Sequence, residues 1–151
     1  MRAVAIGLKI PDNTAFTAAV ALRRLGIAVE RVERSEIWFF EGEGNALIER
    51  VKADETIFNP NKHYVTVLDE TFPRSGEVWI EPLEPRHPDP STGSLEGRRA
   101  TAWRLFGPNE ATLARESLAA AVERLLCNPA VERAVYNKHG KLERDIPRAS
   151  E

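Results

Sequence analysis

Hydrophobic and polar positions alternate at the start of the chain and then change their period. Large apolar side chains stand at every second position in residues 4–10, which is the spacing of a β-strand with one buried face. Residues 12–26 place apolar side chains three and four positions apart and end at a glycine, so they predict a helix with its N-cap at Asp12 or Asn13. Residues 29–40 alternate again before they become mostly apolar. The first forty residues therefore predict a strand, a helix and a second strand.

The middle of the chain predicts shorter elements. Residues 46–54 have the pattern of a short helix. Residues 64–69 and 77–83 read as two short strands, and the turn-rich connection between them predicts a hairpin. Residues 84–97 hold three of the ten prolines and show no periodicity, which predicts a loop.

The last third repeats the order strand, helix, strand. Residues 98–107 predict a strand, residues 108–126 a long amphipathic helix and residues 131–136 a final strand. Pro129 has no amide hydrogen to donate and disfavours the helical conformation at Asn128, so the helix has to end by about Cys127. We interpret Asn128 and Pro129 as a structural helix stop.

These two strand–helix–strand units, at residues 3–40 and 99–136, predict an α/β (α+β) fold, a ferredoxin-like β-α-β-β-α-β sandwich. We expect one domain over residues 1–137 and a polar C-terminal tail over residues 138–151. Residues 41–97 exceed the minimal unit and are either a large insertion or a degenerate duplicated copy. A weak internal echo favours the copy, because Asn59-Pro60 matches Asn128-Pro129 and each follows a predicted helix and precedes a strand.

Composition and charge narrow the class of protein. The 151 residues are 42% hydrophobic and 29% charged, which fits a globular domain and provides no apolar run of the roughly 20 residues that a bilayer requires. The formal charge is −2 with interleaved signs, so we expect neither a membrane nor a nucleic acid as partner. The single cysteine, Cys127, cannot form an internal disulfide, which suits the reducing cytoplasm.

Candidate chemistry is sparse. The sequence has no phosphate-binding loop, nucleophile motif or cysteine pair, and its three histidines, His63, His87 and His139, lie in separate segments. We therefore expect no catalytic residue, no metal site and no cofactor bound by this chain. Asn61, Lys62 and His63 are the candidate ligand-binding residues, because they stand just before a strand and Lys and His together can bind phosphate or carboxylate. The alternative is that this segment serves only as a turn.

Two parts of the sequence resemble a known family. Residues 21–40, with a helix that ends in Leu-Gly before a strand, and residues 116–136 resemble PurS, the small subunit of phosphoribosylformylglycinamidine synthase. The family pattern Leu-Leu-x-Asn-Pro-x-x-Glu is matched here by Leu125, Leu126, Asn128, Pro129 and Glu132. The family is shorter than this chain and lacks the long middle region.

The resemblance implies a noncatalytic assembly subunit of an amidotransferase complex in purine biosynthesis. Its partners would be a large synthetase subunit and a glutaminase subunit, and ATP, Mg²⁺ and glutamine would belong to those partners. The exposed edge strands of a ferredoxin-like sheet also predict a homo-oligomer. Two alternatives stay open from the residues alone: a small-ligand-binding or regulatory module, and an enzyme whose site is not visible in sequence.

Overall fold

The computed structural model describes residues 1–83, 99–138 and 141–144. They form the following elements, in chain order: β1 (Arg2–Leu8), α1 (Asn13–Arg24), β2 (Arg31–Phe40), α2 (Gly44–Ala53), β3 (His63–Val67), β4 (Glu77–Pro82), β5 (Arg99–Phe106), a 3₁₀ turn η1 (Pro108–Glu110), α3 (Arg115–Ala121), a π-helical turn η2 (Val122–Leu126), β6 (Glu132–Lys138) and β7 (Lys141–Arg144).

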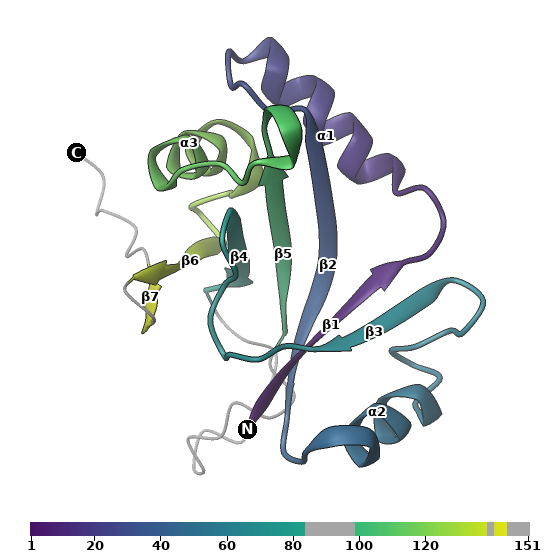
Figure 1. Ribbon diagram of the computed structural model, residues 1–151. Helices are drawn as coiled ribbons and strands as arrows, with labels where there is room; N and C mark the ends of the chain where they lie inside the picture. Colours follow the sequence, from purple (N-terminus) through teal and green to yellow (C-terminus); the bar gives the residue numbers. More distant parts are fainter. Residues whose placement is uncertain (84–98, 139–140, 145–151) are drawn as a thin grey trace.

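All seven of these strands belong to one sheet, in the order β3-β1-β2-β5-β4-β6-β7, and every neighbouring pair is antiparallel (Figure 1). The expectation of a mixed α and β fold is thereby confirmed. The predicted N-terminal helix is confirmed as α1: the Asp12 carboxylate accepts from the Ala15 amide at 3.0 Å, and Gly26 follows the helix with a φ of 88° that suits glycine.

The helices cover one face of the sheet. Residues that oppose each other in an antiparallel pair share a face, so the strand registers place Val32, Val78 and Leu105 on the same side. They form a core with the apolar sides of α1, α3 and η2, where Leu22 and Leu118 are buried. At the other end of this face α2 packs separately, through its own apolar cluster, onto β1. Figure 1 shows α1 and α3 at the upper end of the sheet and α2 at the lower end.

The opposite face carries no helix in the part of the chain that the structure describes. The connection from β3 to β4 crosses the sheet instead, as Figure 1 shows. Leu68 at its start packs with Ala3 and Trp79, and Pro73 within it is fully buried. This crossing explains why the predicted hairpin of residues 64–69 and 77–83 is wrong: β3 pairs with β1, whereas β4 pairs with β5 and β6.

The length of the connection makes this crossing possible. Four strand spacings separate β3 from β4 in the sheet order, or roughly 19 Å. The residues between the two strands can extend over about 30 Å. The turn-rich composition of the segment between β3 and β4 therefore indicates a connection, but it does not specify that the two strands lie far apart in the sheet.

The molecule contains an internal structural repeat. In chain order the first half contains β1, β2, α2 and β3, with α1 inserted between β1 and β2, and its strand order is β3-β1-β2. The second half contains β4, β5, α3 and β6, with η1 and η2 on either side of α3, and its strand order is the same, β6-β4-β5. In each half the helix joins two parallel strands, with the first strand of that half between them. The halves meet where β2 pairs with β5. The strand order is thus the same in the two halves, but the halves do not coincide with residues 41–97, so the choice between an insertion and a duplicated copy for that region stays a prediction.

Several equivalent positions of the two halves hold the same amino acid. His63 and Glu132 each stand four residues after the asparagine of an Asn-Pro dipeptide, and they pair with Leu8 and Pro82 at the ends of β1 and β4. Following the registers inward from these anchors gives six pairs of identical residues at equivalent positions: Val4 and Val78, Ile6 and Ile80, Arg34 and Arg99, Trp38 and Trp103, Asn59 and Asn128, and Pro60 and Pro129.

Two further boundaries differ from the prediction. The last helix begins at Arg115 rather than residue 108, because Asn109 and Glu110 have φ angles of 58° and 61° that break the helical path. Residues 141–144, expected in a polar tail, form strand β7 and extend the sheet beyond β6. The predicted loop at residues 84–97 lies outside the described residues.

Candidate functional site

A cleft of about 590 Å³ lies on the helical face of the sheet, bordered by the start of α1 on one side and by the α2–β3 connection on the other. Its size is within the range of small-molecule sites. The floor comes from the end of β1, the middle of β2 and the start of β5, including Ile6, Glu36 and Thr101. The walls come from Asp12 and from residues 55–59. The cleft exists because α1 and α2 pack over opposite ends of the same face.

The centre of the floor is the axis of the internal repeat. Glu36 and Thr101 occupy equivalent positions in the two halves and also oppose each other in the β2–β5 register. A pseudo-twofold axis therefore passes between them. Each side of the axis carries the same arrangement: the Arg34 guanidinium lies 5.9 Å from the ring centroid of Trp103, and the Arg99 guanidinium lies 5.8 Å from that of Trp38.

The start of α1 breaks this symmetry. Asp12 caps α1 and also accepts from Arg34, with 3.1 Å from Nε to Oδ2 and 3.4 Å from the second guanidinium nitrogen to Oδ1. The Asp12 side chain is 15% exposed, so this ion pair is partly shielded from water. Among the described residues the Arg99 side chain makes neither a hydrogen bond nor an ion pair, and its guanidinium lies near the Trp38 ring. Within the described residues, one of two equivalent arginines is thus paired with a carboxylate and the other is not.

The wall opposite α1 is built by local hydrogen bonds. The Asp54 carboxylate accepts from the amide and the hydroxyl of Thr56, and these bonds lower the pKa of Asp54. Phe58 beyond it is buried and lies against the His63 ring, with 6.0 Å between the ring centroids. These contacts hold the connection close to the end of β1, so the wall is a formed structure rather than a loose loop.

The predicted ligand-binding residues lie in a turn beside this wall. The Asn59 side chain accepts from the Asn61 amide at 2.9 Å, and the Asn59 carbonyl accepts from the amides of Lys62 and His63. The Asn59 amide in turn donates to Nδ1 of His63 at 2.9 Å. When the imidazole is neutral, its proton is therefore on Nε2. The turn docks on β1, where the Lys9 amide donates to the Lys62 carbonyl at 2.7 Å.

The structure separates the three predicted residues. His63 lines the cleft together with Asn59, whereas Asn61 and Lys62 are exposed on the turn and do not line it. Their role in binding stays a prediction. Sequence reasoning missed Glu36, Arg99 and Thr101 on the floor, and the signal that was available is the repeated spacing of arginine and tryptophan in residues 34–38 and 99–103.

Asn128 and Pro129 form the same turn in the second half. Asn128 accepts from the Ala130 amide through its side chain and from the Glu132 amide through its carbonyl, at 3.1 Å and 2.8 Å. Its own amide donates to the Glu132 carboxylate at 3.0 Å. η2 ends at Leu126, directly before this turn. The side chain of Glu132 thus replaces that of His63 in an otherwise equivalent hydrogen-bonding scheme.

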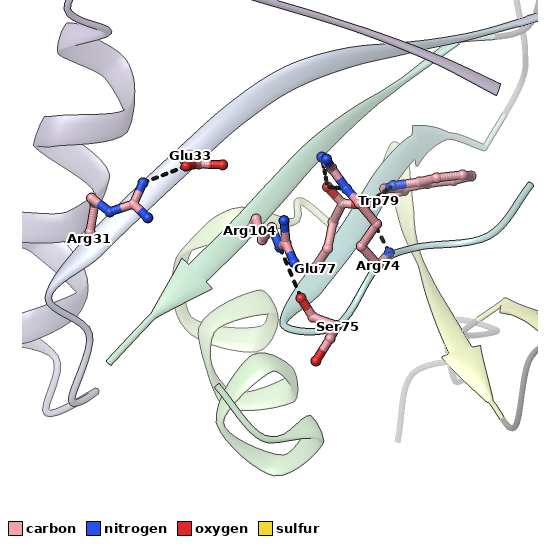
Figure 2. A network of polar contacts seen from close by, with 7 residues as sticks. All are labelled: Arg31, Glu33, Arg74, Ser75, Glu77, Trp79 and Arg104. Carbon is pink, nitrogen blue, oxygen red and sulfur yellow. Dashed lines mark hydrogen bonds and ion pairs between the residues drawn. The ribbon is translucent and has the colours of Figure 1, made fainter. Parts of the chain in front are cut away.

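A second polar cluster lies on the helix-free face. Figure 2 shows Glu77 at its centre, accepting from Arg74 at 2.6 Å and from the indole N–H of Trp79 at 2.9 Å. The Glu77 side chain is fully buried, so these donors compensate the desolvation of its carboxylate. Arg104 donates to the Ser75 carbonyl nearby. Because the donors of this cluster are used internally, we interpret it as a structural lock between β4 and the crossing connection.

Tyr64 and Arg74 on this face have shifted pKa values. Burial, followed by the charge of Glu33, raises the pKa of Tyr64. For Arg74, burial acts to lower the pKa, but the hydrogen bonds and the charge of Glu77 outweigh it and the pKa is raised. The charged Arg74 guanidinium is thereby favoured, and it donates to the buried Glu77 side chain.

Within the described residues no three histidine, cysteine, aspartate or glutamate side chains gather into a group that could hold a metal ion. His87 and His139 lie outside the described residues. Each described helix is too short or too polar to cross a bilayer. No family model, curated protein or solved structure matches the chain. The resemblance to PurS consequently stays a prediction.

Proposed function

We propose that the chain is a small-molecule-binding module and that its ligand occupies the cleft on the axis of the internal repeat. The observation that carries this proposal is the asymmetry of the cleft floor. Two equivalent arginines flank the axis, Asp12 neutralises Arg34, and Arg99 keeps its guanidinium free within the described residues. An arginine that borders a cleft and lies beside an indole ring is suited to hold an acidic group of a ligand.

The walls supply the remaining requirements of such a site. Leu8, Ile57 and Phe58 provide apolar surface, and Thr56, Asn59 and Thr101 provide neutral polar groups. A few polar groups among apolar ones are typical of ligand sites, because the apolar surface contributes affinity and the polar groups fix orientation. His63, predicted from the sequence, is one of the residues at this border.

A thermal-shift screen tests the proposal. The wild-type protein is heated with amino acids, nucleotides, carboxylates and phosphorylated metabolites, and at least one class is expected to raise Tm. Thr101→Phe fills the floor with an aromatic side chain that a strand accommodates, so it should abolish the shift. Thr66→Phe is the matched control, because Thr66 is exposed on β3 and does not line the cleft.

Two outcomes decide between this site and others. If a ligand still raises the Tm of Thr101→Phe, that ligand binds to another part of the molecule. The absence of a shift with every class would contradict a binding function for the cleft.

A second candidate is the assembly subunit that the PurS resemblance implies. Its support is a groove of about 420 Å³ between α1 and η2, lined in part by Ala18, Trp103, Leu125 and Leu126. Leu125 and Leu126 belong to the family pattern, and Leu125 is 42% exposed. A large synthetase and a glutaminase would bind there, and they would hold ATP, Mg²⁺ and glutamine.

The same resemblance supports the ferredoxin-like assignment, as do the two units in which a helix joins parallel strands on either side of a third strand. The single Cys127 supports a cytoplasmic location.

Co-purification tests this second candidate. A tagged chain should retain the synthetase and the glutaminase of the same cell, and Leu125→Asp should release them because it places a charge in the groove. Val131→Asp is the control, since Val131 is 57% exposed but does not line the groove. Retention of neither enzyme by the wild-type chain would refute the assembly role.

A further inference from the structure

The charges that border the cleft restrict the chemistry of its ligand, and this inference rests on the function proposed above. Asp12 and Arg34 neutralise each other. Apart from this pair, the acidic and arginine side chains that line the cleft are Glu36, Glu55 and Arg99, and all three are exposed to solvent. The cleft therefore offers one cation and two carboxylates to a ligand.

The positions of Glu36 and Arg99 are defined by the sheet. Arg99 opposes Trp38 in the β2–β5 register, and Glu36 opposes Thr101. Glu36 and Arg99 are consequently diagonal neighbours on adjacent strands, with roughly 7–8 Å between their backbones. No ion pair joins them in the described structure, although both side chains are long enough for one. Instead, one Glu36 oxygen accepts from the Trp38 indole N–H at 3.3 Å, and the other is free for a ligand.

A ligand with a single sign of charge would be opposed by part of this floor. A polyanion would approach Arg99 but would meet Glu36 and Glu55, and an amine would approach the carboxylates but would meet Arg99. Like charges brought together in a partly desolvated site cost free energy. A molecule with an acidic group and a protonated amine on neighbouring atoms would satisfy both sides at once.

We propose that the cleft binds a zwitterion of the amino-acid class. The carboxylate lies on the Arg99 guanidinium, which can donate two parallel hydrogen bonds, and the ammonium lies on the Glu36 carboxylate. The side chain of the ligand extends toward the apolar wall at Ile57 and Phe58, so an aromatic or large aliphatic amino acid fits best. The indole of Trp38 lies between the two charged groups and holds Glu36 in place.

Isothermal titration with three related probes tests this assignment. L-phenylalanine has both charged groups, 3-phenylpropanoate lacks the amine, and 2-phenylethylamine lacks the carboxylate. Phenylalanine should bind at least tenfold more tightly than either analogue. Equal affinity of phenylalanine and 3-phenylpropanoate would overturn the zwitterion while leaving an anion site. Equal affinity of phenylalanine and 2-phenylethylamine would overturn it in favour of an amine site.

Two variants test which residue binds the ammonium and which binds the carboxylate of the ligand. Glu36→Gln should weaken phenylalanine at least tenfold and leave 3-phenylpropanoate unchanged or tighter, whereas Arg99→Gln should weaken both acids. Glu30→Gln and Arg2→Gln are matched controls, because neither residue lines the cleft. If no amino acid binds but another class gives a shift that Thr101→Phe removes, the zwitterion is wrong and the binding module stands. If no class binds, both proposals fail.

Discussion

The two halves of the sheet share a backbone plan but fill equivalent positions with different chemistry. Gly7 and Tyr64 of the first half are equivalent to Glu81 and Arg133 of the second. In the first half the Tyr64 ring lies over Gly7, so closely that a Cβ at Gly7 would be 2.4 Å from it. In the second half Arg133 donates to Glu81 at 2.6 Å. Equivalent positions of the two halves thus hold an aromatic ring over a glycine in one case and an ion pair in the other.

The helical face shows the opposite behaviour. Both arginine and tryptophan positions are kept in the two halves, and each arginine lies near the tryptophan of the other half. The difference comes from outside the repeat, because α1 brings Asp12 to Arg34. A symmetric floor with one asymmetric neighbour therefore produces a cleft with a single free cation within the described residues.

The largest loss of stability is expected at a position where one half buries a charged residue and the other half buries an apolar one. Glu77 stands at the position of Ala3, which is also fully buried. Glu77→Ala leaves Arg74 and the indole N–H of Trp79 without their acceptor and should lower the free energy of unfolding by about 3–5 kcal/mol. Urea denaturation measures the change. A loss below about 1 kcal/mol would show that the cluster is not a structural lock.

The contact between Gly7 and Tyr64 provides a second comparison. Gly7→Ala places a methyl group against the Tyr64 ring and should cost about 1–3 kcal/mol. Gly107→Ala is the control, because a Cβ there has ordinary contacts of 3.5 Å or more. The cost of Gly7→Ala should shrink in a Tyr64→Ala background. An unchanged cost there would place its origin in the backbone instead.

The two Asn-Pro turns should respond alike. Asn59→Ala and Asn128→Ala each remove one side-chain acceptor from an equivalent turn, so each should cost about 1 kcal/mol. Thermal and urea unfolding of both variants compares them directly. A difference larger than about 1 kcal/mol would mean that one turn has a role that the other lacks.

The smallest effect is expected in the pH dependence of the free energy of unfolding. Because the folded protein raises the pKa of Tyr64, the unfolded chain loses this proton first as the pH rises. The contribution of Tyr64 is complete below the unfolded value of about 10 and is lost as the pH rises through the folded value. Stability should therefore fall less steeply above pH 10 in Tyr64→Phe than in the wild type. Parallel curves for the two proteins would contradict the shift.

Local features were predictable from the sequence, and pairings were not. The cap at Asp12, the stop before Asn128 and most strands follow from residue preferences that act over a few positions. The hairpin prediction failed because composition does not specify the partner of a strand, and the crossing connection depends on nonlocal packing at Leu68 and Pro73.

The candidate site was only partly predictable for the same reason. His63, predicted to bind a ligand because it stands in a polar turn before a strand, lies at the border of the cleft, and its role in binding stays a prediction. Arg34 and Arg99 are far apart in sequence and come together only through the β2–β5 register. The two Asn-Pro dipeptides occupy equivalent positions in the two halves, and extending this comparison to the matching arginines and tryptophans would have indicated the cleft floor.

The central claim is that Asp12 at the start of α1 neutralises Arg34, so that Arg99 is the arginine that binds the ligand, and a comparison of affinities tests it most directly. Calorimetric titration with the amino acid that gives the largest thermal shift compares Arg99→Gln with the double variant Asp12→Asn/Arg34→Gln, which removes the ion pair without changing the net charge. Arg99→Gln should weaken binding at least tenfold, and the double variant should stay within about twofold of the wild type. Equal losses in both variants, or a loss confined to the double variant, would contradict the account.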